Sequence, residues 1–254
     1  MRVSIILLIC GMMLVSGCQA SQPIIEPSPV VTPTETLTPT ATIDWFPRTA
    51  TPTLYVPKAT ATPAPTLIDP GYDSVLIENA FDDQSKWTQL TSKEGNITLE
   101  EQMLVLAIPD LKSELFSLSA YRLPADFFLE ITVDVSLCSD DDVYGVAFWR
   151  FSEMGTHTFL LNCQGEFRIE RLINTSLAVL KDWSVARRMK PGSPTQHKIT
   201  IWAESGKVAF YVDGTHQYDL QVRSGLHGGL GLLARSGGNS PETVTFKDLY
   251  VTQP

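Results

Sequence analysis

The stretch FFLEITVDVSL, from Phe127 to Leu137, alternates between apolar and polar side chains almost without interruption. The odd-numbered residues are all apolar, and the even-numbered residues from Glu130 to Ser136 are polar. Because successive side chains of a β-strand point to opposite faces of a sheet, this period of two predicts a strand with one buried and one hydrated face. The stretch therefore indicates an antiparallel sheet that covers a hydrophobic core on one side.

The same alternation recurs in later parts of the chain, where short turns separate consecutive strands. Apolar residues of one parity run through 199–203, 208–212 and 244–246, and the parity slips at Lys247-Asp248, which indicates a β-bulge. Glycine-containing pairs stand between predicted strands, as is typical of two-residue hairpins. These pairs are Gln164-Gly165, Ser205-Gly206 and Asp213-Gly214.

Residues 71–254 therefore form one predicted domain of about a dozen short strands with no persuasive helix. The segment Val179–Met189 is faintly helical in pattern, but Trp183 and Val185 fit a strand or a loop as well. Many short, evenly spaced antiparallel strands are typical of sandwiches and jelly rolls. We expect an all-β fold, an antiparallel two-sheet jelly-roll sandwich.

Four motifs, taken in order, resemble the concanavalin A-like lectin/glucanase jelly roll, in the form shared by laminin-G-like and 3-keto-disaccharide hydrolase-type domains. Individually weak, they span nearly all of residues 71–254. They are Ile77–Asp82 with Trp87, Tyr144–Phe148, Phe210–Gly214, and Gly228–Ala234 followed by Val244–Leu249. In the second motif an arginine usually follows directly, whereas here Trp149 precedes Arg150. The resemblance implies the fold more than the function, because the same scaffold serves lectins, hydrolases and adhesion modules.

The segment before this domain has the features of an export signal and a spacer. Residues 1–17 combine Arg2 with a short apolar run, and Val15-Ser16-Gly17 before Cys18 resembles the bacterial lipobox. We expect Cys18 to carry lipid and to hold the chain on the extracytoplasmic side of the cell membrane; an ordinary secretory signal is the alternative. Residues 18–70 hold eleven of the 17 prolines, interleaved with threonine, which predicts an extended linker.

The cysteines that remain after signal removal and lipidation are Cys138 and Cys163. An even pair in an exported domain predicts a disulfide, and two free thiols or half of a metal site are the alternatives. Each cysteine follows a predicted strand, with the strand Tyr144–Arg150 between them in sequence. We expect both sulfur atoms at the same end of one sheet, with the loop at 139–142 folded inward.

No catalytic residues are predicted. Glu130 and Asp134 share a strand face, but at ~3.3 Å per residue they stand about 13 Å apart, too far for a glycosidase pair. Asp140-Asp141-Asp142 lies in a loop and could bind calcium, although a solvated turn is the better interpretation. The histidines show no metal-ligand spacing, so no metal and no cofactor are expected.

Aromatic residues offer the best candidate ligand-binding positions, because sugars stack on exposed rings. Trp202 and Tyr211 have parity opposite to the apolar residues of their strands and are expected to face solvent or a concave face. Tyr144, Trp149 and Arg150 are further candidates, although most aromatic residues in a sandwich are core.

The formal net charge of −9 argues against nucleic acid as a partner. The sequence thus predicts a lipid-anchored, surface-displayed, non-catalytic binding module for carbohydrate. A structural or protein-interaction sandwich that binds a surface protein is the second hypothesis, and a glycoside hydrolase is the third.

Overall fold

The computed structural model describes residues 70–72, 74–78, 80–109, 112–152 and 155–254. The predictions of a signal peptide at 1–17, of lipid on Cys18 and of a linker up to 69 lie outside the described residues. Within the described residues, no helix is long and apolar enough to cross a membrane.

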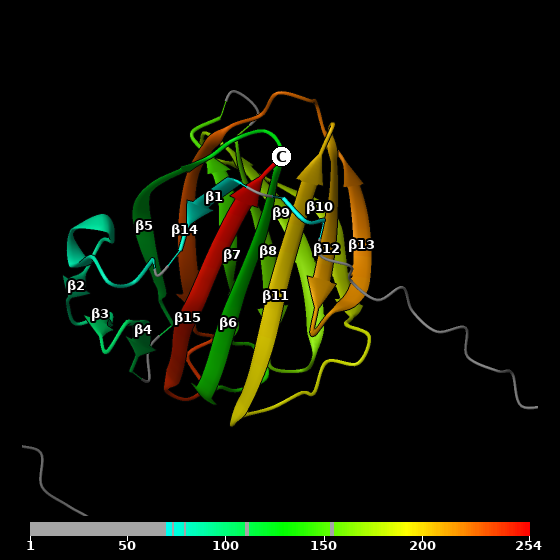
Figure 1. The fold of residues 1–254 in the computed structure, drawn as a ribbon. Coiled ribbons are helices and arrows are strands. Elements are labelled where there is room, and N and C mark those ends of the chain that lie inside the picture. Colours follow the sequence, from blue (N-terminus) through cyan, green and yellow to red (C-terminus); the bar gives the residue numbers. More distant parts are fainter. Residues whose placement is uncertain (1–69, 73, 79, 110–111, 153–154) are drawn as a thin grey trace, which may run out of the picture. The chain divides into compact units, whose positions relative to one another are not determined.

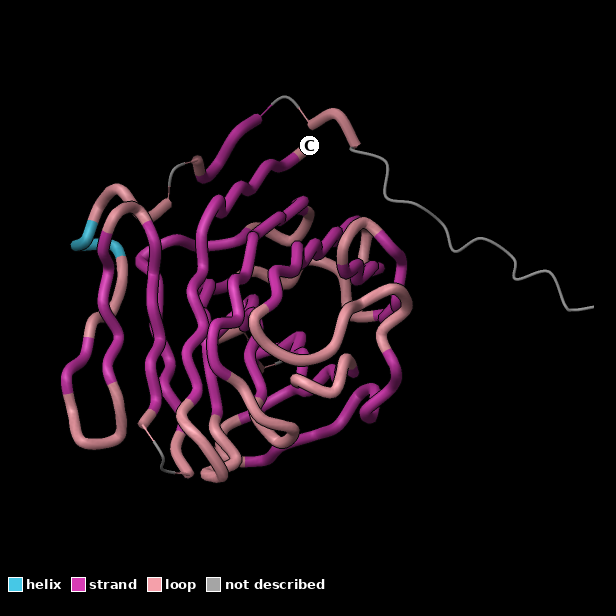
Figure 2. Tube along the Cα trace, turned by 90° about the horizontal axis from the view of Figure 1, so that it is seen from below, coloured by secondary structure: helices cyan, strands magenta, loops and turns pink. Residues whose placement is uncertain are grey.

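Two antiparallel sheets pack face to face as a jelly-roll sandwich, with β6, β11 and β15 in front and β7, β8 and β9 behind in Figure 1. The nine-stranded sheet has the order β13-β12-β11-β6-β15-β4-β3-β2, with β1 also on β15, and the six-stranded sheet has the order β10-β9-β8-β7-β14-β5. One 3₁₀ turn, η1 (Gln84–Lys86), is the helical element of the described part, cyan in Figure 2. The all-β prediction is confirmed.

The strand bounds are as follows. The nine-stranded sheet contains β1 (Ser74–Ile77), β2 (Leu90–Thr91), β3 (Asn96–Glu100), β4 (Met103–Ile108), β6 (Phe127–Leu137), β11 (Thr195–Glu204), β12 (Lys207–Val212), β13 (Thr215–Gln221) and β15 (Glu242–Gln253). The six-stranded sheet contains β5 (Glu114–Leu123), β7 (Val143–Arg150), β8 (Thr156–Asn162), β9 (Glu166–Ile173), β10 (Ser176–Val185) and β14 (Gly228–Arg235).

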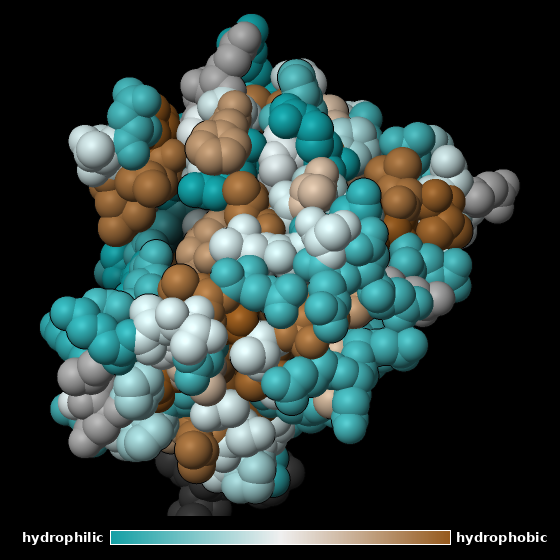
Figure 3. Space-filling model, turned by 90° about the vertical axis from the view of Figure 1, so that its left-hand side faces the viewer, coloured by the Kyte–Doolittle hydropathy of each residue, from teal (hydrophilic) through white to brown (hydrophobic). Residues whose placement is uncertain are grey.

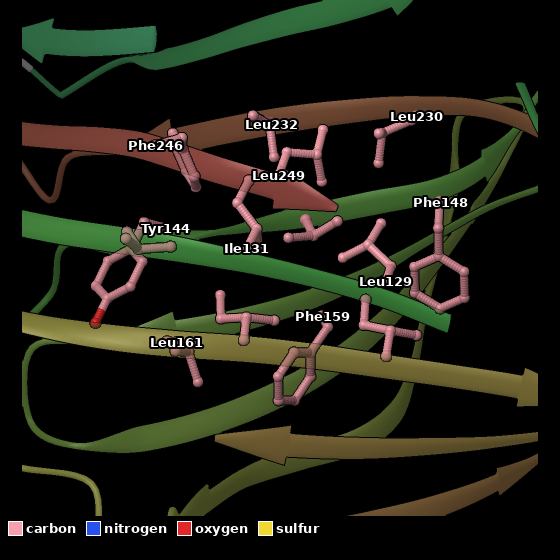
Figure 4. Close-up of a cluster of buried hydrophobic side chains, with 14 of the residues drawn as sticks. Leu129, Ile131, Tyr144, Phe148, Phe159, Leu161, Leu230, Leu232, Phe246 and Leu249 are labelled. Carbon is pink, nitrogen blue, oxygen red and sulfur yellow. The ribbon is translucent and has the colours of Figure 1, made fainter. Parts of the chain in front are cut away.

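The core lies between the sheets and is built from the alternating apolar residues of both. Leu129 and Ile131 of β6 meet Phe159 and Leu161 of β8, as Figure 4 shows. Phe127, Leu129, Ile131, Val133 and Val135 are all buried, whereas Leu137 at the end of the strand is exposed. The period-two prediction therefore holds for the inner face of β6 except at its last residue, whereas on the outer face Phe128 and Thr132 are also buried.

The predicted turns are hairpins with residues in the left-handed region. Ser205-Gly206 joins β11 to β12, and Asp213-Gly214 joins β12 to β13; both residues of each pair have positive φ, as type I′ turns require. The register of β15 shifts between Lys247 and Tyr250, with Asp248 at φ 52°, which confirms the predicted bulge. The segment 179–189, whose pattern fits a helix or a strand, begins inside the edge strand β10 and continues beyond its end at Val185.

Cys138 and Cys163 form the predicted disulfide, with Cα atoms 6.1 Å apart. The expectation that both lie on one sheet is wrong. Cys138 follows β6 of the nine-stranded sheet, and Cys163 follows β8 of the six-stranded sheet. The chain crosses from one sheet to the other through the loop after β6, so the disulfide links the two layers of the sandwich.

Hydrophilic and hydrophobic side chains are intermixed on the face seen in Figure 3. Brown hydrophobic groups there are interrupted by teal polar ones, and the surface is hollowed on the left beneath a projecting hydrophobic group. Scattered apolar residues are ordinary on a soluble surface, so only a hollow with a defined lining is informative about binding.

Candidate functional site

A groove of about 460 Å³ lies on the outer face of the six-stranded sheet, away from the core. Its lining residues come mainly from β5, β14, β7, β8 and β9. They are Thr88, Glu114, Phe116, Leu118, Arg150, Thr156, Thr158, Glu170, Leu172, Leu177, Leu233 and Arg235. The groove thus has apolar, polar and charged residues from strands that are far apart in sequence.

Small residues form the sheet beneath the groove. The register places Gly231 of β14 beside Ala147 of β7, which in turn faces Thr158 of β8. A Cβ atom added at Gly231 would lie 2.3 Å from Cζ of Phe116, so the Phe116 ring packs directly over this glycine. The absence of larger side chains in the middle of the sheet leaves room for a ligand beside this ring.

Arg150 reaches the groove because of a local distortion at the end of β7. Phe148 and Trp149 are both in the core, although neighbours on a regular strand point to opposite faces. Trp149 has φ 51°, and the pairing of β7 with β14 changes register between Gly229 and Gly231. Because of this irregularity, Arg150 emerges on the outer face of the sheet.

The guanidinium of Arg150 lies over two aromatic rings. Its Cζ atom lies 4.7 Å from the ring centroid of Phe116 and 4.4 Å from that of Phe151. A cation held over aromatic faces keeps one orientation while its N–H groups remain available at its edge. Arg150 and Phe116 can therefore offer hydrogen-bond donors and an apolar ring to the same ligand.

Glu170 of β9 brings a carboxylate into the groove, at 3% exposure of the residue. Its Oε1 lies 3.0 Å from Nε of Arg168, at an angle that makes the contact an ion pair rather than a hydrogen bond. Arg168 also lies 3.9 Å from Asp182 and 5.7 Å from the Trp183 ring centroid. At another edge of the groove, Glu114 and Arg235 form an ion pair at 2.7 Å.

Two of the predicted ligand-binding residues are not accessible. Tyr144 and Trp149 are each 1% exposed, and Nε1 of Trp149 donates a hydrogen bond to the Pro124 carbonyl at 2.8 Å. Both belong to the core, so their prediction as ligand-binding aromatics is wrong. The physical reason is that β7 is central in the sheet, and its tyrosine and tryptophan fill the interior.

Trp202 and Tyr211 lie on the outer face of the other, nine-stranded sheet, and line a hollow of about 120 Å³ there. Trp202 is half-buried and donates from Nε1 to the Tyr72 hydroxyl at 3.1 Å. Tyr211 is only 9% exposed and packs edge-on against His216. Both residues thus face away from the core as predicted, but Trp202 is only partly exposed and Tyr211 is nearly buried, and neither residue reaches the groove.

The other carboxylates have structural partners. Glu130 pairs with Lys198 at 2.6 Å, and Asp134 accepts from Gln196 at 2.7 Å and also pairs with Lys247, so this face of β6 is an ordinary ion-paired surface. The interpretation of the acidic loop as solvated is wrong for Asp142. That carboxylate is buried and accepts the backbone N–H groups of Ser139 and Gly237 at 2.6 and 2.9 Å.

Among the described residues, no group of three histidine, cysteine, aspartate or glutamate side chains is arranged to hold a metal ion. Asp142 already uses both of its oxygens within the loop, since Oδ2 accepts from Ser139 and Oδ1 from Gly237. Its geometry is that of a side chain that organises a turn.

Comparison with solved structures shows the same fold at low sequence identity. The chain is similar to the carbohydrate-binding module CBM66 from Bacillus subtilis, with a TM-score of 0.52, 13% identity, and coverage of 66% of this chain and 96% of that one. A Bacillus subtilis protein of unknown function with a galectin-like fold gives a TM-score of 0.53 at 12% identity, covering 72% and 97%.

An endo-β-galactosidase from Clostridium perfringens that releases GlcNAcα1-4Gal gives a TM-score of 0.54 at 15% identity, covering 76% of this chain and 65% of the enzyme. No protein-family model and no curated protein matches the chain. The structural neighbours are therefore galectin-like and concanavalin A-like jelly rolls, both carbohydrate-binding modules and glycoside hydrolases.

Proposed function

We propose that this protein is a non-catalytic carbohydrate-binding module, which is held at the cell surface by lipid and binds a glycan in the groove of the six-stranded sheet. The observation that carries the proposal is the groove itself. It combines an aromatic ring at Phe116, stacked donors at Arg150 and a buried acceptor at Glu170 above a sheet of small residues. Sugar rings need this combination, an apolar surface for their C–H faces and charged or polar groups for their hydroxyls.

The spacing of acidic groups supports binding rather than hydrolysis. Of the described residues that line the groove, Glu114 and Glu170 carry carboxylates. They lie on β5 and β9, with β14, β7 and β8 between them, which places the strands about 19 Å apart at ~4.8 Å per step. Glycosidase carboxyl groups stand ~5 to ~9.5 Å apart, so these two do not flank one bond.

A second carboxylate near Glu170 belongs to Asp182, which contacts the same Arg168 nitrogen. The Asp182 side chain is 81% exposed and does not line the groove. The two carboxylates therefore do not face each other across a ligand position. A hydrolase remains the third hypothesis, and a protein-interaction module without a sugar site remains the second.

Replacement of Arg150 by alanine is expected to weaken glycan binding about tenfold or more, because the ligand loses charge-assisted hydrogen bonds and the Phe116 ring loses its stacked partner. A glycan array with the full-length protein first identifies the ligand. Calorimetric titration of that ligand then compares the wild type with the Arg150→Ala variant.

Two variants make this test specific. Arg187→Ala removes an equal charge from an exposed position outside the groove and is expected to leave affinity unchanged. Trp202→Ala tests the hollow on the nine-stranded sheet. If Trp202→Ala loses affinity and Arg150→Ala does not, the glycan binds on the nine-stranded sheet and not in the groove. If no glycan on the array binds, the protein-interaction hypothesis is favoured.

The anchoring part of the proposal is supported by the apolar run and by Val15-Ser16-Gly17 before Cys18. We expect a palmitate analogue supplied to growing cells to label the wild type and not the Cys18→Ala variant. Cys10→Ala is the matched control, because Cys10 lies within the signal and is removed with it. Label retained by Cys18→Ala would contradict lipidation at this residue.

A further inference from the structure

A second cavity, of about 280 Å³, lies at the end of the sandwich where β8 begins and where β9 and β13 end. It is lined by His157, Arg171, Leu180, Leu220, Gln221, Val222, Arg223 and Leu226. His157 and Arg171 are sequence neighbours of Thr156 and Leu172, which line the groove on the outer face. Side chains alternate along a strand, so the cavity lies on the inner side of the same strands.

His157 and Arg171 stand directly opposite each other on β8 and β9. His157 is 1% exposed, and its Nδ1 atom has no hydrogen-bond partner. The buried Nε of Arg171 also lacks a hydrogen-bond partner among the described residues. Buried polar atoms without hydrogen-bond partners are rare in folded proteins, and each calls for an explanation.

The wall of this cavity carries positively charged residues. Arg223 also lies on the cavity wall and has an interaction of its own. No aspartate or glutamate is found among the described residues that line the cavity. The chain as a whole has a formal net charge of −9, so a cavity wall with positive charge is opposite in sign to the protein's net charge.

His157 is held neutral and fixed in orientation. Its ring stacks on Phe148 at 5.6 Å and contacts the edge of Trp149 at 5.7 Å. Burial, with a smaller contribution from the Arg171 charge, lowers the pKa of His157 to about 4. A neutral imidazole offers one N–H donor near neutral pH, while Arg171 supplies a permanent charge.

We propose that this cavity is a binding site for the acidic group of a small ligand, a carboxylate or a sulfate, which accepts hydrogen bonds from Arg171 and His157. A guanidinium matches the two oxygens of such a group, and the leucine and valine side chains that line the cavity lower the local polarity and so strengthen the attraction. The volume suits one acidic monosaccharide or a comparable organic acid. The site is separate from the groove and does not depend on the glycan proposal.

Calorimetric titration of the purified full-length protein with glucuronate, glucose 6-sulfate and glucose tests the proposal. We expect saturable binding of at least one of the two anions and none of glucose. Binding of glucuronate alone assigns a carboxylate, binding of the sulfate alone assigns a sulfate, and binding of both assigns a site for either anion. Binding of neither anion to the wild type overturns the proposal, and so does binding of glucose as tight as that of the anions.

Arg171→Met is expected to weaken anion binding at least tenfold, and Arg171→Lys, which keeps the charge without the planar fork, by less. Arg187→Met, an exposed arginine outside the cavity, is the matched control and should bind as the wild type does. If Arg171→Met does not fold, a measurement on the wild type still tests the proposal. The anion should shift the NMR signals of the His157 ring, and unchanged ring signals at saturating anion contradict the site.

Discussion

Replacement of both Cys138 and Cys163 by serine is expected to lower the free energy of unfolding by about 3 to 4 kcal/mol. The sequence separation between the two cysteines is 25 residues, and in the chain-entropy model a cross-link closing a loop of this length contributes roughly that amount. The effect is large for a single domain, because the total stability of such a domain is ~5 to ~15 kcal/mol. Denaturant unfolding of the oxidised wild type and of the double variant measures the difference.

The bridge has a particular value because it links the two layers of the sandwich. No backbone ladder joins β6 to β7 or to β8, which belong to the other sheet. Reduction of the wild type should give the same loss as the double substitution, and this is the matched control, since it removes the bond without changing a residue. A double variant within about 0.5 kcal/mol of the oxidised wild type would show that the bridge contributes little.

The architecture was predictable where one side of a strand packs on the core and the other side faces water, as in β6, although β7 and β14 at the centre of the six-stranded sheet are buried on both faces. The alternation in Phe127–Leu137 follows directly from this, and the glycine pairs at 205–206 and 213–214 mark turns that require positive φ. The pairing of Cys138 with Cys163 could be predicted because they are the two cysteines that remain in a domain predicted to be exported. The sheet to which each cysteine is attached could not be predicted, because the alternation of side chains shows which face a residue lies on but not which of the two sheets its strand joins.

The groove could not be predicted either, because the sequence does not show which strands lie side by side. Its centre consists of Gly231, Ala147 and Thr158, from three strands that the topology alone brings side by side. None of these residues is distinctive in the sequence. Glu170 alternates with Phe167 and Ile169 as any polar residue on a hydrated face would, so nothing in the pattern separates it from Glu130.

Trp149 shows how one local distortion misleads a parity argument. A regular β7 would have placed Trp149 on the outer face and Arg150 in the core. The left-handed φ at Trp149 instead sends the indole inward, where it packs against Phe127 at 5.7 Å. The left-handed conformation of Trp149 therefore explains both why this residue is buried and why Arg150 lies in the groove.

Glu242 leads to the second prediction with a large expected effect. It is the first residue of β15, is fully buried, and neither oxygen of its carboxyl group has a hydrogen-bond partner. Burial, and then the nearby charge of Asp142, raises the pKa of Glu242 to about 9, against a smaller opposing effect of Arg235. The carboxyl group is therefore protonated in the folded state near neutral pH.

The direction of the pH dependence follows from proton binding in the two states. Between pH 4.5 and about 9 the folded state holds the Glu242 proton and the unfolded state has released it. Stability rises with pH only where the unfolded state binds more protons, so here Glu242 lowers stability as the pH rises. Below pH 4.5 both states are protonated, and the contribution vanishes.

Glu242→Gln is expected to remove this loss, because the amide has a similar shape and never ionises. The variant should differ least from the wild type near pH 5, and its advantage in free energy of unfolding should grow by on the order of 4 kcal/mol towards pH 8. Denaturant unfolding at both pH values measures the difference. Glu114→Gln, at a surface carboxylate paired with Arg235, is the control and should show no comparable growth with pH. Since all other titrating groups are common to the wild type and the variant, an equal difference at pH 5 and pH 8 would mean that Glu242 is ionised in the folded protein.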